Sequence, residues 1–214
     1  MKLTILCSSK EHPIFPQLLK WKESNSKNHQ IHLINSRNEV SDGDILFLIS
    51  CTEIIGNEIR KNFKKTLVVH ASDLPKGRGW SPHVWSILKG SNKIVVSLLE
   101  AEDKVDSGNI WKKQNIYLVG HELFDEINSK IFSTTLELMN FTIENFEKIK
   151  PTSQEGDPGE YYPQRFPKDS EIDIKKSILE QFNLLRISDT NRFPCFFNYK
   201  GHKYKIFLEK FDDK

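Results

Sequence analysis

Residues 66–101 read TLVVHASDLPKGRGWSPHVWSILKGSNKIVVSLLEA, and this stretch determines the fold that we expect. It begins with a short apolar run that ends at His70, and it closes with a second apolar run at 93–101. Runs of this length and composition are typical of strands that are buried on both faces. Between them, Ser81 followed by Pro82 indicates the start of a helix, because serine caps helix N-termini and proline suits the first helical position. The stretch therefore predicts a strand, a loop, a helix and a second strand.

The same alternation fills the sequence that precedes this stretch. Short apolar runs predict strands at 2–8, 29–35 and 44–50, and helical patterns between them predict helices at 14–23 and 52–63. Strands that alternate with helices are typical of a mainly parallel sheet with helices on both faces. We therefore expect an α/β fold.

A long amphipathic helix is expected at residues 131–149. Its apolar side chains recur at steps of four and three, as on one face of a helix, and they are Phe132, Leu136, Met139, Ile143 and Phe146. A stripe of this kind is more often part of a core than of a cofactor site. We expect this helix to complete a main domain at residues 1–150.

Residues 151–214 are expected to form a smaller C-terminal extension. The segment 150–171 is rich in proline and lacks apolar periodicity, so it predicts an irregular crossing. A second helix should follow, with Ser170 and Asp173 as its capping pair; its apolar positions are Ile174, Ile178, Phe182 and Leu185. The last element should be a β-hairpin that turns at Lys200–Gly201.

The composition narrows the class of protein. The 214 residues include 31 basic and 29 acidic ones, a net charge of +2, which gives no strong electrostatic indication of nucleic-acid or lipid binding. The three cysteines are widely spaced, so neither a disulfide framework nor a zinc site is expected. No apolar run has the length of a membrane span, and the first one is too short for a signal peptide. We expect a cytoplasmic protein without a membrane partner.

Two loops are left as candidates for chemistry. The sequence has no P-loop, no dinucleotide-binding glycine motif and no metal-ligand motif, and the basic run 60–65 reads as a solvated helix end. One loop follows His70, at the sheet edge where ligands bind in folds of this type. The other, 102–110, contains Asp106 and follows the next strand. Taken singly, each loop is adequately explained as a turn.

Taken together, the loops resemble those of the formyltransferases that use N10-formyltetrahydrofolate. The residues that match the first block of that family are His70, Ser72, Leu74, Pro75, Arg78, Gly79, Ser81 and Pro82, and those that match the second block are Asp106, Gly108 and Ile110. The resemblance implies a Rossmann-like sheet for a formyltransferase catalytic domain at 1–150, with a helix and β-hairpin extension at 151–214.

The tail resembles the formyltransferases that act on nucleotide-linked amino sugars. The matching residues are Arg165, Pro167, Asp169, Ile172, Asp173 and Arg186. The resemblance implies transfer of a formyl group from N10-formyltetrahydrofolate, without a metal, to the primary amine of such a sugar, which would be destined for a bacterial surface polysaccharide. It also suggests a homodimer formed through the C-terminal element. The chain could instead be a methionyl-tRNA or glycinamide ribonucleotide formyltransferase. The nearly neutral net charge argues against a tRNA substrate, because phosphate contacts need a basic surface.

The resemblance also implies roles for individual residues. His70 and Asp106, with Ser72 as a further catalytic candidate, would stabilise the oxyanion and take the proton of the amine, and which of the first two is the acid and which the base stays open. Folate would be bound largely by backbone groups of the candidate residues Cys51, Thr52, Ile54, Ile55 and Val105. The candidate acceptor-binding residues are Lys76, Arg78, Gly79 and Trp80; Lys76 and Arg78 could equally be solvated loop charges.

One departure from the family pattern bears on activity. The family has asparagine two residues before the catalytic histidine, and this sequence has Val68, which cannot donate a hydrogen bond to the formyl oxygen. Either Ser50, Thr52, Ser72 or a backbone N–H replaces that donor, or the chain is an impaired, formyltransferase-like binding protein. A smaller departure is Asn109, where the family often has aspartate.

Overall fold

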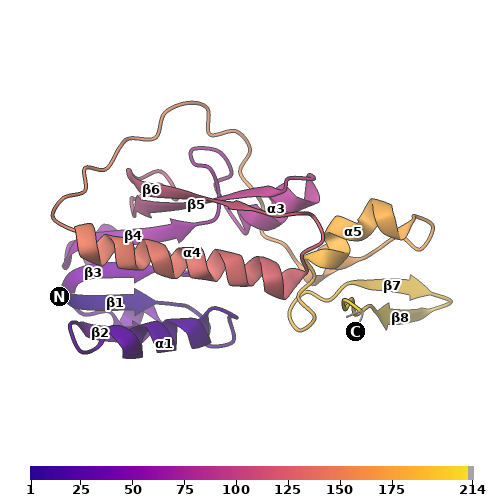
Figure 1. Ribbon diagram of the computed structural model, residues 1–214, viewed down its shortest axis with the longest axis horizontal. Helices are drawn as coiled ribbons and strands as arrows, with labels where there is room; N and C mark the ends of the chain where they lie inside the picture. Colours follow the sequence, from indigo (N-terminus) through magenta and orange to yellow (C-terminus); the bar gives the residue numbers. More distant parts are fainter. Residues whose placement is uncertain (212–214) are drawn as a thin grey trace.

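A six-stranded sheet forms the centre of the molecule (Figure 1), whose computed structural model describes residues 1–211. The strand order is β2-β1-β3-β4-β5-β6. The strands are β1 (Lys2–Leu6), β2 (Gln30–Ile34), β3 (Gly43–Leu48), β4 (Phe63–His70), β5 (Lys93–Glu100) and β6 (Ile110–Tyr117). The helices are α1 (Phe15–Asn25), α2 (Asn57–Arg60), α3 (Pro82–Leu88), α4 (Phe124–Asn145) and α5 (Ile178–Arg186), with short 3-10 turns at Arg37–Glu39 and Pro167–Ser170. The α/β prediction is confirmed.

The sheet is mostly parallel, and among its six strands β5 alone runs the other way. β2, β1, β3 and β4 are mutually parallel, whereas β5 is antiparallel to β4 and β6 is antiparallel to β5. The seven-residue α3 is too short to carry the chain back along the sheet, so β5 starts at the edge where β4 ends. The sheet therefore ends in a β5–β6 hairpin, and the loop between these strands leaves β5 beside Thr66 and not beyond the end of β4.

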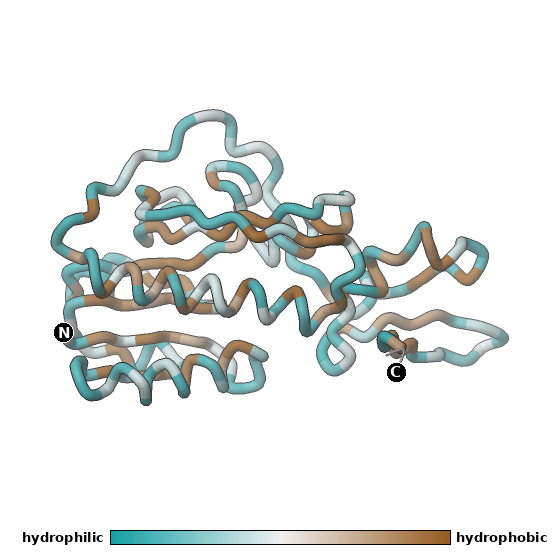
Figure 2. Tube along the Cα trace, viewed as in Figure 1, coloured by the Kyte–Doolittle hydropathy of each residue, from teal (hydrophilic) through white to brown (hydrophobic). Residues whose placement is uncertain are grey.

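Helices cover the two faces of the sheet unequally. Alternate residues of β3 enter different clusters, because successive side chains of a strand point to opposite faces. Ile45 and Phe47 join the large core under α1, α3 and α4, and Leu46 and Leu48 join a smaller cluster that includes Ile59 of α2. Figure 2 shows apolar residues along several of the strands. The predicted stripe on α4 is part of the large core.

The helix predicted at 52–63 is wrong over most of its length. Only α2 is helical there, and Phe63 belongs to β4, where it pairs with Gly43. Ile55 is 5% exposed and packs on the sheet with Leu46 and Leu48. The apolar residues of this segment thus serve the sheet face and not one side of a helix, and tertiary packing overrides the local pattern.

Helix α5 and the β-hairpin that follows it lie beside the end of the sheet (Figure 1). The hairpin prediction is confirmed: β7 (Phe196–Tyr199) and β8 (His202–Lys205) are joined by Lys200 and Gly201, both with positive φ, as a two-residue turn requires. The predicted cap of α5 is wrong. Ser177 and Glu180 form the capping box, and Ser170 is instead buried at the end of a 3-10 turn, where Arg165 donates to its hydroxyl.

A buried ionic cluster attaches α5 to the sheet. Glu122, 3% exposed, accepts hydrogen bonds from the N–H groups of Val119 and Gly120 and from Nζ of Lys130. Arg186 of α5 is 1% exposed, and its Nη1 lies 3.9 Å from a carboxylate oxygen of Glu122. Burial opposes the charge of Glu122, but the hydrogen bonds outweigh it and lower its pKa to about 2. Within residues 1–211, no helix combines the length and the hydropathy needed to cross a membrane.

Candidate active site

His70 is the last residue of β4, so the sheet fixes its position. Its backbone pairs with Ser97 of β5, and its side chain is 10% exposed. Nε2 lies 3.0 Å from the carbonyl oxygen of Gly77 and donates to it, because a carbonyl can only accept. Nδ1 faces Oδ1 of Asp106 at 3.6 Å. The structure thus brings together the two residues that the sequence motifs single out.

Asp106 reaches His70 from an unexpected direction. The sequence predicts that its loop follows a strand, as it does, but because β5 is antiparallel the loop begins beside Thr66 and not beyond the end of β4. The loop instead folds back over the face of the sheet, and Asp106 adopts a left-handed φ of 55°. Its carboxylate is 7% exposed, and Oδ2 accepts a hydrogen bond of 3.1 Å from the N–H of Gly79. One carboxylate therefore contacts both the histidine and the loop that follows it.

The glycine of each motif block permits a close backbone approach. A Cβ at Gly79 would collide with the carbonyl oxygen of Tyr162, and a Cβ at Gly108 would collide with that of Glu100. Gly79 also has a φ of 106°, which side chains rarely tolerate. These two glycines let the loops that carry the two motif blocks lie against their neighbours.

The segment 150–166, here called the crossing segment, is held against both loops. Figure 1 shows it passing over the edge of the sheet that carries β5 and β6. Thr152 exchanges two backbone hydrogen bonds with Ile110, of 2.8 and 2.9 Å. Further along, Tyr162 donates to the carbonyl of Arg78 and accepts from the N–H of Trp80. The C-terminal part of the chain thus completes the site from outside.

Val68 lies on the same face of β4 as His70, two residues earlier. Its side chain packs against the small apolar cluster of Leu74, Leu99 and Ile110. No donor stands in place of the family's asparagine at this point of the strand. The position is lined with hydrocarbon and offers a formyl oxygen no hydrogen bond.

Ser72 is the best placed of the candidate replacement donors. It is 6% exposed, and its hydroxyl has no hydrogen-bond partner within the described chain. Its backbone is fixed, since its N–H bonds to the carbonyl of His70 and its carbonyl accepts from Oγ of Ser97 at 2.7 Å. Ser50 and Thr52 are exposed. Ser72 is therefore the hydroxyl that is both rigidly placed near His70 and free to donate.

The two predicted folate loops lie near each other, joined by Arg60. This residue donates to the carbonyl of Ile55 at 2.8 Å and to the carboxylate of Asp103 at 2.6 Å. Its side chain is 11% exposed, so the reading of the basic run as a solvated helix end is wrong for Arg60. Ile54 and Val105 are 66% and 43% exposed, whereas Ile55 is buried and can offer only its backbone.

The remaining folate candidates differ in exposure. Thr52 is exposed, and its N–H donates to Oγ of Ser8. Cys51 is half-buried, and burial raises the pKa of its thiol, which is therefore neutral at physiological pH. Neither residue presents a charged group to a ligand.

The candidate acceptor-binding residues differ in their hydrogen bonds and in their exposure to solvent. The N–H of Gly79 bonds to Asp106 and that of Trp80 bonds to Tyr162, and Trp80 as a whole is 36% exposed. Nε of Arg78 is buried without a partner in the described chain, and Lys76 is exposed.

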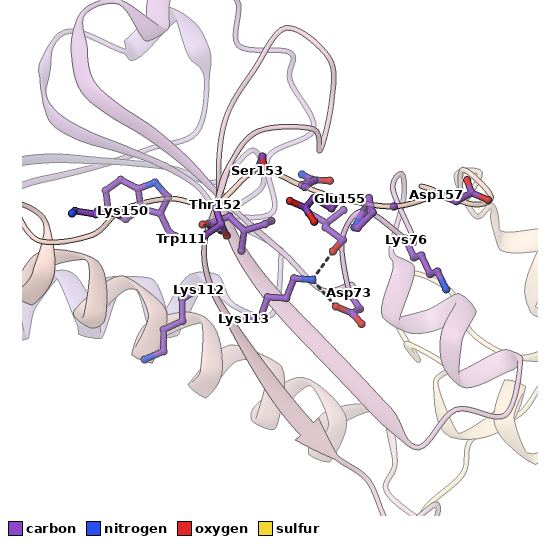
Figure 3. Close-up of a pocket in the computed structure, with 15 residues that line it drawn as sticks. Asp73, Lys76, Trp111, Lys112, Lys113, Lys150, Thr152, Ser153, Glu155 and Asp157 are labelled. Carbon is purple, nitrogen blue, oxygen red and sulfur yellow. Dashed lines mark hydrogen bonds and ion pairs between the residues drawn. The ribbon is translucent and has the colours of Figure 1, made fainter.

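A groove of about 510 Å³ lies beside these loops (Figure 3). The loop after β4, the start of β6 and the crossing segment line it. Lys113 closes one side by bonding to the carboxylate of Asp73 and the carbonyl of Leu74. The charged lining residues are Asp73, Lys76, Lys112, Lys113, Lys150, Glu155 and Asp157.

A second histidine near the site stays neutral. His83 lies on α3, and burial together with the charge of His70 lowers its pKa to about 4. It is therefore uncharged at physiological pH, and His70 is the histidine that faces a carboxylate. Within residues 1–211, no group of three or more His, Cys, Asp or Glu side chains is arranged to hold a metal ion.

Sequence reasoning missed Gln154. Its side-chain amide donates to the carbonyls of Asp106 and Gly108 and accepts from Arg78. Nothing in the proline-rich crossing segment distinguishes this glutamine, because its partners are backbone carbonyls that only the folded chain brings near.

The chain belongs to the Formyl transferase family, whose pattern it matches over residues 4–140. His70, Asp106 and most of the sheet lie within that range. Among curated relatives, it is 29% identical over 170 residues to the bifunctional polymyxin resistance protein ArnA of Wigglesworthia glossinidia brevipalpis, covering 78% of this chain and 26% of that protein. It is 27% identical over 192 residues to the methionyl-tRNA formyltransferase of Rickettsia massiliae, covering 89% and 62% of the two chains. The chain thus spans only part of the length of these relatives.

Solved structures share the fold. A methionyl-tRNA formyltransferase from Clostridium thermocellum superposes with a TM-score of 0.81 at 22% identity, covering 95% of this chain and 90% of that one. A sugar N-formyltransferase from Shewanella sp. FDAARGOS_354 gives 0.74 at 16% identity, covering 100% and 99%. HypX from Aquifex aeolicus in complex with tetrahydrofolic acid gives 0.78 at 21% identity, covering 95% and 36%. At these identities the likeness is one of fold, and it does not separate one acceptor from another.

Proposed function

We propose that this protein transfers a formyl group from N10-formyltetrahydrofolate to a primary amine. The observation that carries the proposal is the contact of 3.6 Å between His70 and Asp106, made by two loops that match the blocks of the family. Such a pair can stabilise a developing oxyanion and move a proton, which are the two tasks of acyl transfer to an amine.

The chain's own groups divide these tasks as follows. As the amine nitrogen bonds to the formyl carbon, negative charge develops on the formyl oxygen, and His70 donates a hydrogen bond to it. Asp106 holds the imidazole in place, and one of the two accepts the proton that the amine loses. Because Nε2 already bonds to Gly77, the loop 71–79 has to release it when substrate arrives. Bound folate supplies the formyl carbon, and its N10 is reprotonated as it leaves.

The site has features that fit a folate. Ile54 and Val105 present exposed apolar side chains on loops that Arg60 ties together. A flat pterin ring needs such apolar contact on its face and backbone groups along its edge. We propose that the five candidate folate residues form this site, with Ile55 acting through its backbone alone.

The proposed acceptor is a nucleotide-linked amino sugar. The tail motif at Arg165–Asp173 supports it, and so does the match to a sugar N-formyltransferase over nearly the whole of both chains. The net charge of +2 argues against a tRNA partner. Lys76 and Arg78 are the proposed contacts for the phosphates, since the Arg78 guanidinium has no carboxylate partner within residues 1–211 and therefore suits an anion. Methionyl-tRNA is the second candidate, favoured by the Rickettsia and Clostridium relatives.

Incubation with N10-formyltetrahydrofolate and a panel of amines tests the proposal. The panel contains UDP-, GDP- and dTDP-linked amino sugars, methionyl-tRNA and glycinamide ribonucleotide. We expect mass spectrometry to detect the gain of one formyl group on at least one amino sugar and on neither of the other acceptors. Transfer to methionyl-tRNA would overturn the proposed amino-sugar acceptor and would support the proposed formyl-transfer reaction. Folate binding without transfer to any amine would identify an impaired binding protein.

Ser72→Ala should slow the transfer by about 10²-fold, the effect of removing one oxyanion donor. The reason is that the Ser72 hydroxyl is free to donate, whereas Val68 has no donor to offer. Steady-state kinetics measure the loss, and Ser133→Ala on α4, which removes an exposed hydroxyl, is the matched control. In the Ser72→Ala background, Val68→Asn should restore part of the rate. A Ser72→Ala rate within about threefold of the native one would show that another group stabilises the oxyanion.

A further inference from the structure

The side chain of Gln154 joins the two catalytic loops. Its Nε2 donates to the carbonyl oxygens of Asp106, at 2.9 Å, and Gly108, at 2.8 Å. Its Oε1 accepts from Nη2 of Arg78 at 3.0 Å. One amide thus bonds to the backbone on both sides of Ser107 and to the loop that follows His70. Both polar atoms of the amide are used.

The loop that Gln154 holds needs support. Asp106 has a φ of 55°, a conformation that is unfavourable for a residue with a side chain. The carbonyls that Gln154 binds are the group on Asp106 itself and the one two residues later, so its amide fixes the turn that aims the carboxylate. That carboxylate then has two partners, Nδ1 of His70 and the N–H of Gly79.

We propose that Gln154 is a positioning residue for formyl transfer, which it serves by holding the Asp106 carboxylate opposite His70. The inference rests on the proposed function. The crossing segment itself does not depend on this side chain, since the backbone bonds of Thr152 to Ile110 and of Tyr162 to Trp80 attach it independently. Loss of the amide therefore loosens the Asp106 turn without detaching the segment.

Two substitutions separate the donor from the acceptor role of the amide. Gln154→Glu keeps an oxygen for Arg78 but cannot donate to the two carbonyls, and it places a carboxylate against them. Gln154→Leu removes both roles at similar volume. Gln164→Glu, at an exposed glutamine of the same segment, is the matched control for charge.

Hydrogen exchange of individual backbone amides reports the position of the carboxylate without any turnover. The N–H of Gly79 is bonded to Asp106, and that of the adjacent Trp80 is bonded to Tyr162. In both Gln154 variants we expect the Gly79 amide to exchange about tenfold faster or more, as for the loss of one hydrogen bond, and the Trp80 amide to stay within about twofold. Equal acceleration of both amides would mean that the whole segment has loosened, and no acceleration at Gly79 would mean that Gln154 does not hold the turn. Either result overturns the proposal.

Kinetics supply the second readout. In Gln154→Glu we expect kcat to fall about 10²-fold, as for a misplaced catalytic group, with KM for donor and acceptor within about threefold. Gln164→Glu should match the native enzyme. A kcat within threefold of native in Gln154→Glu would refute the positioning role. If the native protein transfers no formyl group at all, the proposed function has failed, and the exchange of the Gly79 amide still decides whether Gln154 positions Asp106.

Discussion

Asp106→Asn should lower the rate of formyl transfer by about 10³-fold or more, within the range that catalytic acids, bases and oxyanion donors contribute. Asparagine keeps the shape of the side chain and one oxygen for the N–H of Gly79, so the loop should stay in place. It removes the negative charge that faces Nδ1 of His70 at 3.6 Å, and it cannot accept the proton of the amine. His70→Ala should cost at least as much, because it removes the donor to the formyl oxygen.

Single-turnover kinetics with saturating donor and acceptor measure this loss apart from binding. Glu102→Gln makes the same change of charge at an exposed residue of the same loop and should leave the rate unchanged. Thermal unfolding of all three variants should stay close to that of the native chain. Native rates in Asp106→Asn would show that the carboxylate takes no part in the chemistry, and the proposed site would have to be abandoned.

The sequence predicts five of the six strands of the sheet and the proximity of His70 and Asp106, and it does so for different reasons. The strands β1 to β5 are predicted because each is a short apolar run that suits a buried sheet, whereas β6 is missed because Lys112, Lys113, Gln114 and Asn115 interrupt its apolar residues. The proximity of His70 and Asp106 is predicted because the two loops that carry them match the motif blocks of one family in the correct order. The direction of β5 cannot be predicted from the sequence, since an apolar run such as Lys93–Glu100 suits a parallel and an antiparallel strand equally. The approach of Asp106 over the face of the sheet was therefore not predictable.

The misplaced helices have a related cause. A pattern of apolar residues indicates that side chains are buried, but it does not indicate which part of the protein they pack against. Ile55 is buried against the sheet and not on a helix face. Ile174, counted as a helix position, is 49% exposed in irregular chain before α5. The sequence does not reveal the contacts of Gln154 and Arg60, because each of these polar side chains bonds to main-chain carbonyls that only the folded chain brings near.

The ionic cluster beneath α5 should make the fold sensitive to acid and to one substitution. Glu122→Gln leaves Arg186 buried without its nearest carboxylate, and breaking a buried pair in this way costs about 3–5 kcal/mol. For a chain of this size, such a loss lowers Tm by about 10 °C. Differential scanning calorimetry at pH 7 measures it. Glu126→Gln is the matched control, because the exposed Glu126 pairs with Lys210 at the surface, where an ion pair contributes less than about 1 kcal/mol.

The free energy of unfolding should also depend on pH in a way that reflects the buried Glu122 carboxylate. Glu122 has a pKa of about 2 in the folded chain, below the ordinary pKa of 4.5 that applies when the chain is unfolded. A depressed pKa contributes stability that is fully present above pH 4.5 and is lost as the pH falls toward 2, in an amount of about 3 kcal/mol. Denaturant titrations between pH 6 and pH 2, in steps of about one unit, should show a steeper acid loss for the native chain than for Glu122→Gln. Parallel curves would mean that Glu122 is not held as a buried anion and that α5 is anchored by packing alone.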